Sequence, residues 1–134
     1  MDTMLDRFRS HGDESQSVVH ELSSWGDVAA LALELASDGR VVITPSLAAE
    51  APQLVVSLGE RSLVPSFDEP VAEVADAAVG IVRGDLAVVE TGSVLVSADT
   101  LADRAVSMLS RTVLQVVDRD RFVGRLDDVA QWLA

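Results

Sequence analysis

Two short apolar runs separated by only four residues constrain the fold of this chain more than any other feature of its sequence. The runs, Leu86–Val89 and Val94–Val96, are rich in β-branched and aliphatic side chains, which is typical of strands. The tetrad between them, Glu90–Ser93, is too short for anything but a tight reversal. We therefore expect an antiparallel pair of strands with Glu90, Thr91, Gly92 and Ser93 at its turn.

This tetrad is the first candidate for a functional site. Loops at strand ends are held by a rigid sheet and remain open to a ligand, so a carboxylate and two hydroxyls placed there favour binding. The alternative is an ordinary hairpin turn. In that case Gly92 permits a positive φ, and the hydroxyls of Thr91 and Ser93 satisfy the turn amides. The residue types predict where a site lies without naming its chemistry.

Composition limits the possible partners. At 134 residues and 49% hydrophobic content, the chain is expected to form a single domain over residues 1–134. Its formal net charge is −12, and all 10 basic residues are arginines. Such an acidic chain repels phosphate backbones and anionic lipids, so we expect neither nucleic acid nor membrane as a partner.

The absence of cysteine limits the chemistry of the chain. Without cysteine there is no disulfide, no thiolate nucleophile and no cysteine-ligated iron–sulfur cluster or zinc in this sequence. His11 and His20 lie far apart without partners at metal-ligand spacing, so we predict no metal site. The charged N-terminus and the lack of a long apolar run predict a cytoplasmic protein.

Strand and helix patterns alternate along the whole chain. Strands are expected at Ser17–Leu22, Arg40–Thr44, Leu54–Leu58, Leu86–Val89, Val94–Val96 and Thr112–Val117. Helices are expected at Leu5–Arg9, from a Ser24 cap to Gly39, at Ser46–Gln53, from Asp68 to a stop at Gly80, from Asp99 or Thr100 onward, and at Leu126–Leu133. In the helix after Thr100, Leu101, Ala105, Met108 and Leu109 are expected to face inward. This alternation predicts a three-layer α/β fold whose mostly parallel sheet is made mixed by the tight reversal.

The central motif also resembles a known family. The block Ala78–Val96, followed by Arg104–Leu109, Val113–Val117 and the charged Asp118–Phe122, is similar in order and spacing to the LUD domain, in particular to lactate utilization protein C. The resemblance covers most of the chain. It departs in three respects: Ser110 stands where the family commonly has proline, the usual C-terminal GPSRTADIE-like segment is missing, and so is a longer N-terminal helical region. The chain is therefore expected to be a short version of the domain.

The resemblance implies a fold similar to the NagB/RpiA/CoA-transferase group. It also implies a part in the oxidation of L-lactate to pyruvate beside iron–sulfur subunits, with the clusters held only by those partners. Self-association as a homodimer is the other expected partnership. A competing hypothesis is a non-catalytic module that binds or senses a small organic acid or acyl-CoA, and a third is a structural pseudo-subunit. Whether the chain is itself an enzyme stays open, and no cofactor is expected in it.

Five positions join Glu90 as candidate site residues. Glu90 is the candidate catalytic carboxylate, and the candidate ligand-binding residues are Asp85, Thr91, Gly92, Ser93 and Arg104. Asp85 and Arg104 match the family's aspartate and arginine. Arg104 could pair with a ligand carboxylate in a fork geometry, although an exposed helix arginine is usually solvated. Asp85 could instead cap a turn.

Overall fold

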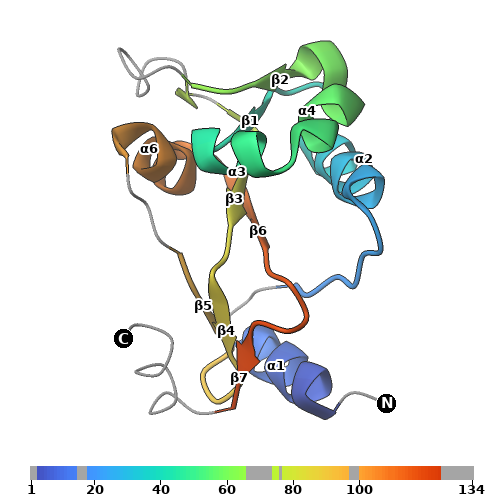
Figure 1. Ribbon diagram of the computed structural model, residues 1–134, viewed down its shortest axis with the longest axis vertical. Helices are drawn as coiled ribbons and strands as arrows, with labels where there is room; N and C mark the ends of the chain where they lie inside the picture. The colour runs from blue at the N-terminus through green and yellow to red at the C-terminus, as the bar shows by residue number, and fades with distance from the viewer. Residues whose placement is uncertain (1–2, 15–17, 66–73, 76, 97–99, 125–134) are drawn as a thin grey trace. The chain divides into compact units, whose positions relative to one another are not determined.

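The computed structural model describes residues 3–14, 18–65, 74–75, 77–96 and 100–124, which form two compact units (Figure 1). The four-stranded unit comprises Leu22–Arg83 and Ala98–Val116. The three-stranded unit comprises Met1–Glu21, Gly84–Ser97 and Val117–Ala134. The assignment of residues 1–134 to one domain stays a prediction.

The four-stranded unit is built on a parallel sheet with the strand order β2-β1-β3-β6. Its strands are β1 (Val41–Ile43), β2 (Ser62–Leu63), β3 (Val79–Arg83) and β6 (Thr112–Val116). Its helices are α2 (Trp25–Ala36), α3 (Pro45–Glu50), α4 (Pro52–Leu58), the short 3-10 helix η1 (Gly59–Arg61) and α6 (Leu101–Leu109).

The core of this unit lies at the pairing of its two central strands. Val41 and Ile43 of β1 pair with Val79 and Ile81 of β3, and all four side chains are completely buried. Helices α2, α3 and α4 pack against these residues on one face of the sheet. On the opposite face Val106 of α6 and Ser110, the C-cap of that helix, lie so close to Gly80 that an added Cβ would clash with them. The predicted three-layer α/β fold is therefore confirmed.

The three-stranded unit contains the strands β4 (Leu86–Val88), β5 (Ser93–Leu95) and β7 (Phe122–Val123) and the helix α1 (Thr3–Glu14). Its strand order is β5-β4-β7, with β4 antiparallel to β5 and parallel to β7. Phe8 of α1 packs with the buried Ala87 and Val89, and its ring meets that of Phe122 edge to face at 5.1 Å. The predicted reversal is confirmed, but it belongs to this small sheet rather than to the larger one.

Several predicted elements are confirmed together with the signals that predicted them. Ser24 caps α2, its side chain accepting a hydrogen bond from the backbone N–H of Asp27 at 3.1 Å. Thr100 caps α6 in the same way, through the N–H of Asp103 at 3.1 Å. The predicted strands at residues 40–44 and 112–117 correspond to β1 and β6.

The strand predicted at Ser17–Leu22 is wrong over residues 18–22, which form no regular structure. Val18 is 77% exposed, so the apolar residues of this run do not enter a sheet. The segment is held instead by Glu21, whose carboxylate forms ion pairs with Arg9, at 3.6 Å, and with Arg119.

The strand predicted at Leu54–Leu58 is also wrong, because this run forms α4. Pro52 occupies the first turn of α4, where its fixed φ and missing N–H favour a helix start. Leu54 and Leu58, four residues apart, are buried on one face, whereas Val56 is 80% exposed. The strand that follows β1 is the short β2, which the sequence did not predict.

Three other predictions differ from the structure. The first helix is longer than the predicted Leu5–Arg9, since α1 runs from Thr3 to Glu14. Gly80 ends no helix, since it lies inside β3. In α6, Ala105 faces inward as predicted, but Leu101, Met108 and Leu109 are exposed. Small side chains face the sheet there because of the close approach at Gly80.

The helix expected from Asp68 lies largely outside the described residues, and the helix expected at Leu126–Leu133 lies entirely outside them.

None of the described helices combines the length and the apolar composition that a bilayer-spanning helix needs.

Two glycines with positive φ provide a matched test of the packing around the hairpin turn. Gly92 (φ 67°) lies against α1, where an added Cβ would approach the backbone N of Gly12 to 2.6 Å. Gly59 (φ 64°) has open space around it. Gly59→Ala should lower the free energy of unfolding by about 1–2 kcal/mol through backbone strain alone. Gly92→Ala should cost at least ~3 kcal/mol, because α1 must also move.

Urea denaturation followed by circular dichroism measures both losses. Equal losses for the two variants would show that the turn does not pack tightly on α1.

Candidate functional site

The structure brings the four tetrad residues together at the turn between β4 and β5. Val88 pairs with Ser93, so the chain reverses within a few residues. The backbone N–H of Glu90 donates to the carbonyl of Gly124 at 3.0 Å, and that of Gly92 to the carbonyl of Val88 at 3.0 Å. The backbone of the turn is thus part of the fold. The side chains of Glu90, Thr91 and Ser93 are exposed, so they remain within reach of a ligand.

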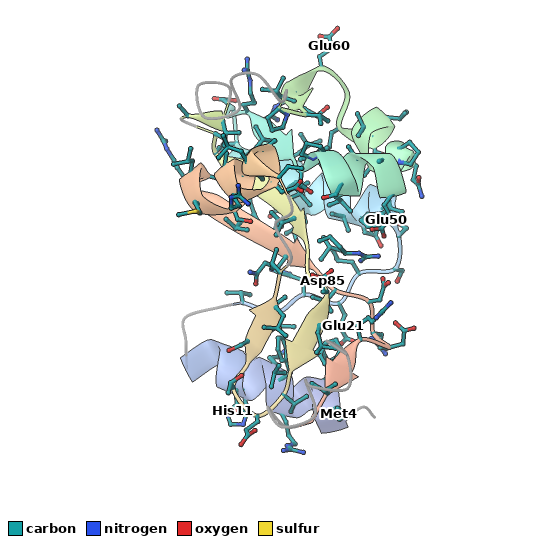
Figure 2. All side chains as sticks on the ribbon, turned by 60° about the vertical axis from the view of Figure 1, so that its left-hand side comes forward. Met4, His11, Glu21, Glu50, Glu60 and Asp85 are labelled. Carbon is teal, nitrogen blue, oxygen red and sulfur yellow. The ribbon has the colours of Figure 1, made fainter. Side chains whose placement is uncertain are left out.

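Asp85 is not part of this turn. It precedes β4, and its backbone N–H donates to the carbonyl of Leu95 at 2.8 Å, at the open end of the hairpin. Strand β4, which is roughly 10 Å long, lies between Asp85 and the turn. Figure 2 shows Asp85 at one end of β4 and His11, which packs beside Gly92, at the other.

Arg104 belongs to the other compact unit. It lies on α6, its side chain is exposed, and its backbone N–H donates to the carbonyl of Thr100 within the helix. Of the six candidate residues, the structure groups Glu90, Thr91, Gly92 and Ser93 at the turn, whereas Asp85 lies at the other end of the hairpin and Arg104 belongs to the other unit. Their proposed roles in ligand binding stay predictions.

A second candidate site lies at the carboxyl ends of β1 and β3. The chain leaves β1 through α3 and α4 toward β2 on one side of the sheet, whereas the strand on the other side of β3 is β6. The strand order therefore reverses between β1 and β3. Ligands of open α/β sheets bind outside the carboxyl ends of strands at such a switch point. The residues that end these two strands are Thr44 and Arg83.

Arg83 carries the positive charge of this second site. Its side chain is only 21% exposed and pairs with the carboxylate of Glu50, at the end of α3. Its guanidinium also lies 5.9 Å from the ring centre of Trp25 and donates to the carbonyl of Val116 at 3.4 Å. A guanidinium held in this way is a forked donor suited to carboxylates. Figure 2 shows Glu50 on α3, beside which this cluster forms.

Asp103 of α6 is a buried charged residue of the same unit. Only 3% of it is exposed, and it lies three residues after the cap of α6. Its Oδ1 accepts a hydrogen bond from the hydroxyl of Ser46 at 3.0 Å. Ser46 lies in the first turn of α3, directly after the buried Thr44, which caps that helix. The side chains of Asp103 and Ser46 thus join the N-terminal turns of α3 and α6.

Within the described part of the chain, no three histidine, cysteine, aspartate or glutamate side chains gather into a group that could hold a metal ion. The guanidinium of Arg83, held by Glu50 and Trp25, could bind a carboxylate.

Sequence reasoning missed this second site for identifiable reasons. Arg83 precedes the tetrad by seven residues and looks like an ordinary polar residue between two apolar runs. The signal that could have found it is its place at the end of a strand. Asp103 follows Thr100 by three residues, a spacing that indicates a helix cap and gives no sign of burial.

Comparison with known proteins agrees with the fold. The sequence matches the model of the LUD domain over residues 6–134. A DUF162 family protein from Deinococcus radiodurans has a similar structure, with a TM-score of 0.75 and 25% sequence identity over 96% of this chain and 76% of that protein. A search of the curated proteins returned no match. Because the family model spans nearly the whole sequence, this chain belongs to the LUD domain family.

Proposed function

We propose that this chain is a non-redox component of the oxidation of L-lactate to pyruvate in the cytoplasm, working with iron–sulfur partner subunits. Membership of the LUD family supports the proposal. Oxidation of lactate removes two electrons, which need an acceptor. The 134-residue sequence has no cysteine with which to ligate a cluster, so in this scheme the acceptor belongs to a partner.

The observation that carries the proposal is Arg83 at the carboxyl end of β3. Its guanidinium is half-buried, fixed by Glu50 and Trp25, and placed at the switch point of the sheet. A guanidinium offers five N–H donors, so a ligand carboxylate can join or replace Glu50 on it. The role that follows for the chain is to hold the organic acid while a partner accepts the electrons.

Association with a partner or with a second copy is part of the same proposal. Leu101, Met108 and Leu109 of α6 are 54%, 78% and 43% exposed. Apolar side chains left exposed on one helix are typical of surfaces that become buried in an assembly. Affinity purification from lactate-grown cells should recover either an iron–sulfur protein or a homodimer.

A matched pair of arginine variants tests the role of Arg83. Arg83 and Arg119 each form an ion pair with a glutamate, but Arg119 is 66% exposed and lies on the other unit. A strain lacking this chain should fail to grow on L-lactate and still grow on pyruvate. Complementation with Arg119→Gln should restore growth on L-lactate, and Arg83→Gln should not, because the carboxylate of the acid loses its forked partner.

Equal growth with both variants would contradict the role of Arg83. Unchanged growth of the deletion strain on L-lactate, with altered expression of the lactate genes, would favour the alternative function of a regulatory module that binds an organic acid.

Glu90 is proposed as a separate ligand-contacting carboxylate. Its side chain is exposed and its backbone N–H bonds to Gly124, so Glu90→Gln should change the free energy of unfolding by less than about 0.5 kcal/mol. The same variant should abolish growth on L-lactate, because the charge that serves the ligand is lost. A variant that loses several degrees of melting temperature and still supports growth would show that Glu90 serves only the turn.

A further inference from the structure

Strand β6 lies at one edge of the four-stranded sheet. Among the described strands it pairs with β3 alone, so the backbone groups on its other side are offered to no strand. None of its five residues is buried, whereas four of the five residues of β3 are. Edge strands usually avoid pairing with other chains by means of charged side chains or proline, and Thr112–Val116 contains neither. Such an edge is a template for a further strand.

The backbone groups on the open side of β6 belong to Val113 and Gln115. The backbone N–H of Thr112 donates to the carbonyl of Ala78 at 3.0 Å, so the backbone of Thr112 faces β3. The direction of these groups alternates along a strand. The N–H and C=O groups of Leu114 therefore also point toward β3, and those of Val113 and Gln115 point away from it.

A second copy of β6 satisfies these groups if the two strands pair antiparallel about Leu114. In that register Val113 lies opposite Gln115 of the second copy, and each N–H and C=O of these residues finds a partner. The two Leu114 residues meet as a pair without hydrogen bonds, whose side chains approach closely. The arrangement uses the same surface on both copies, so it closes at a dimer.

The helix that covers this part of the sheet exposes apolar side chains toward the same edge. Asp103 of α6 accepts a hydrogen bond from Ser46, which follows β1, so this flank of α6 faces the β1 side of the sheet. Leu101 and Met108 lie about 140–160° around the helix from Asp103, on the flank toward β6. They are 54% and 78% exposed. Pairing of the two β6 strands turns these flanks of the two α6 helices toward each other.

The charges of this surface favour a second copy as the occupant. The chain has 22 acidic residues and a formal net charge of −12, so two copies repel each other at an acidic surface. Between Leu101 and Val116 the only acidic residue is Asp103, which is buried. Two copies can therefore meet at β6 without bringing exposed carboxylates together. A second copy also presents a strand of the same length and the same uncharged sequence.

We propose that two copies of this chain join edge to edge through β6 into one continuous sheet, four strands from each copy. Leu101 and Met108 of the two α6 helices become buried across the two-fold axis. The inference gives a geometry to the self-association named above, and it does not depend on a role in lactate oxidation.

A matched pair of charged variants tests the contribution of α6. At about 100 μM the wild-type protein should have twice the 14.2 kDa mass of one chain by light scattering. Met108→Glu should be monomeric, because it places two carboxylates at the contact of the helices. Val56 of α4 is 80% exposed, like Met108, but α4 covers the opposite face of the sheet, so Val56→Glu should stay dimeric. A monomeric wild-type protein, or a Met108→Glu variant as dimeric as Val56→Glu, would overturn the proposal.

Single cysteines test the register, since the chain has none of its own. In the proposed pair the two Cα atoms at position 114 lie about 4.5 Å apart, which a disulfide can bridge. Mild oxidation should therefore turn most of Leu114→Cys into a covalent dimer on a non-reducing gel. Gln115→Cys is the control: its side chain is more exposed, but its two copies lie about 8 Å apart, so it should cross-link at least ~5-fold more slowly.

Equal cross-linking of Leu114→Cys and Gln115→Cys would show that β6 does not pair in this way. The comparison of Met108→Glu with Val56→Glu decides the proposal if Leu114→Cys does not fold. A monomeric wild-type protein that recovers an iron–sulfur protein from lactate-grown cells would overturn this inference and leave the proposed function standing. A dimer joined through β6, combined with normal growth of the deletion strain on L-lactate, would overturn the proposed function and leave the inference standing.

Discussion

The buried pairing of β1 with β3 is the constraint on which the four-stranded unit depends. Val41, Ile43, Val79 and Ile81 lose all contact with solvent, and three helices pack on them from one side. A parallel pair covered in this way is stable only if the connections lie on both faces of the sheet. It also makes the carboxyl ends of its two strands rigid, so Thr44 and Arg83 are positioned by the core rather than by loops.

The same core positions the residues of α3 that bind two charged side chains. Ser46 and Glu50 follow β1 within one short helix, which Thr44 caps. Each receives a partner from a distant part of the chain, Asp103 for Ser46 and Arg83 for Glu50. The two charges are therefore fixed relative to α3 before any ligand arrives, and such preorganisation lowers the entropic cost of binding.

Features set by local chemistry could be predicted from the sequence, and features set by tertiary packing could not. The caps Ser24 and Thr100 and the reversal at Glu90–Ser93 follow from short-range signals and are confirmed. The run Leu54–Leu58 is β-branched, yet it folds as a helix because its spacing of four matches the surface of α2. The prediction of which residues of α6 face inward was wrong in part. Only the tertiary structure shows that the helix approaches the sheet closely at Gly80, where only small side chains fit.

The candidate sites show the same division. The polar tetrad was visible in the sequence because its residues are contiguous. The contacts of Arg83 with Glu50 and of Asp103 with Ser46 join residues far apart in the sequence, so no local pattern could have predicted them. A crystal structure of this protein with L-lactate bound tests the central claim most directly. The account predicts the carboxylate of lactate on Arg83, and lactate bound elsewhere, with Arg83 untouched, would contradict it.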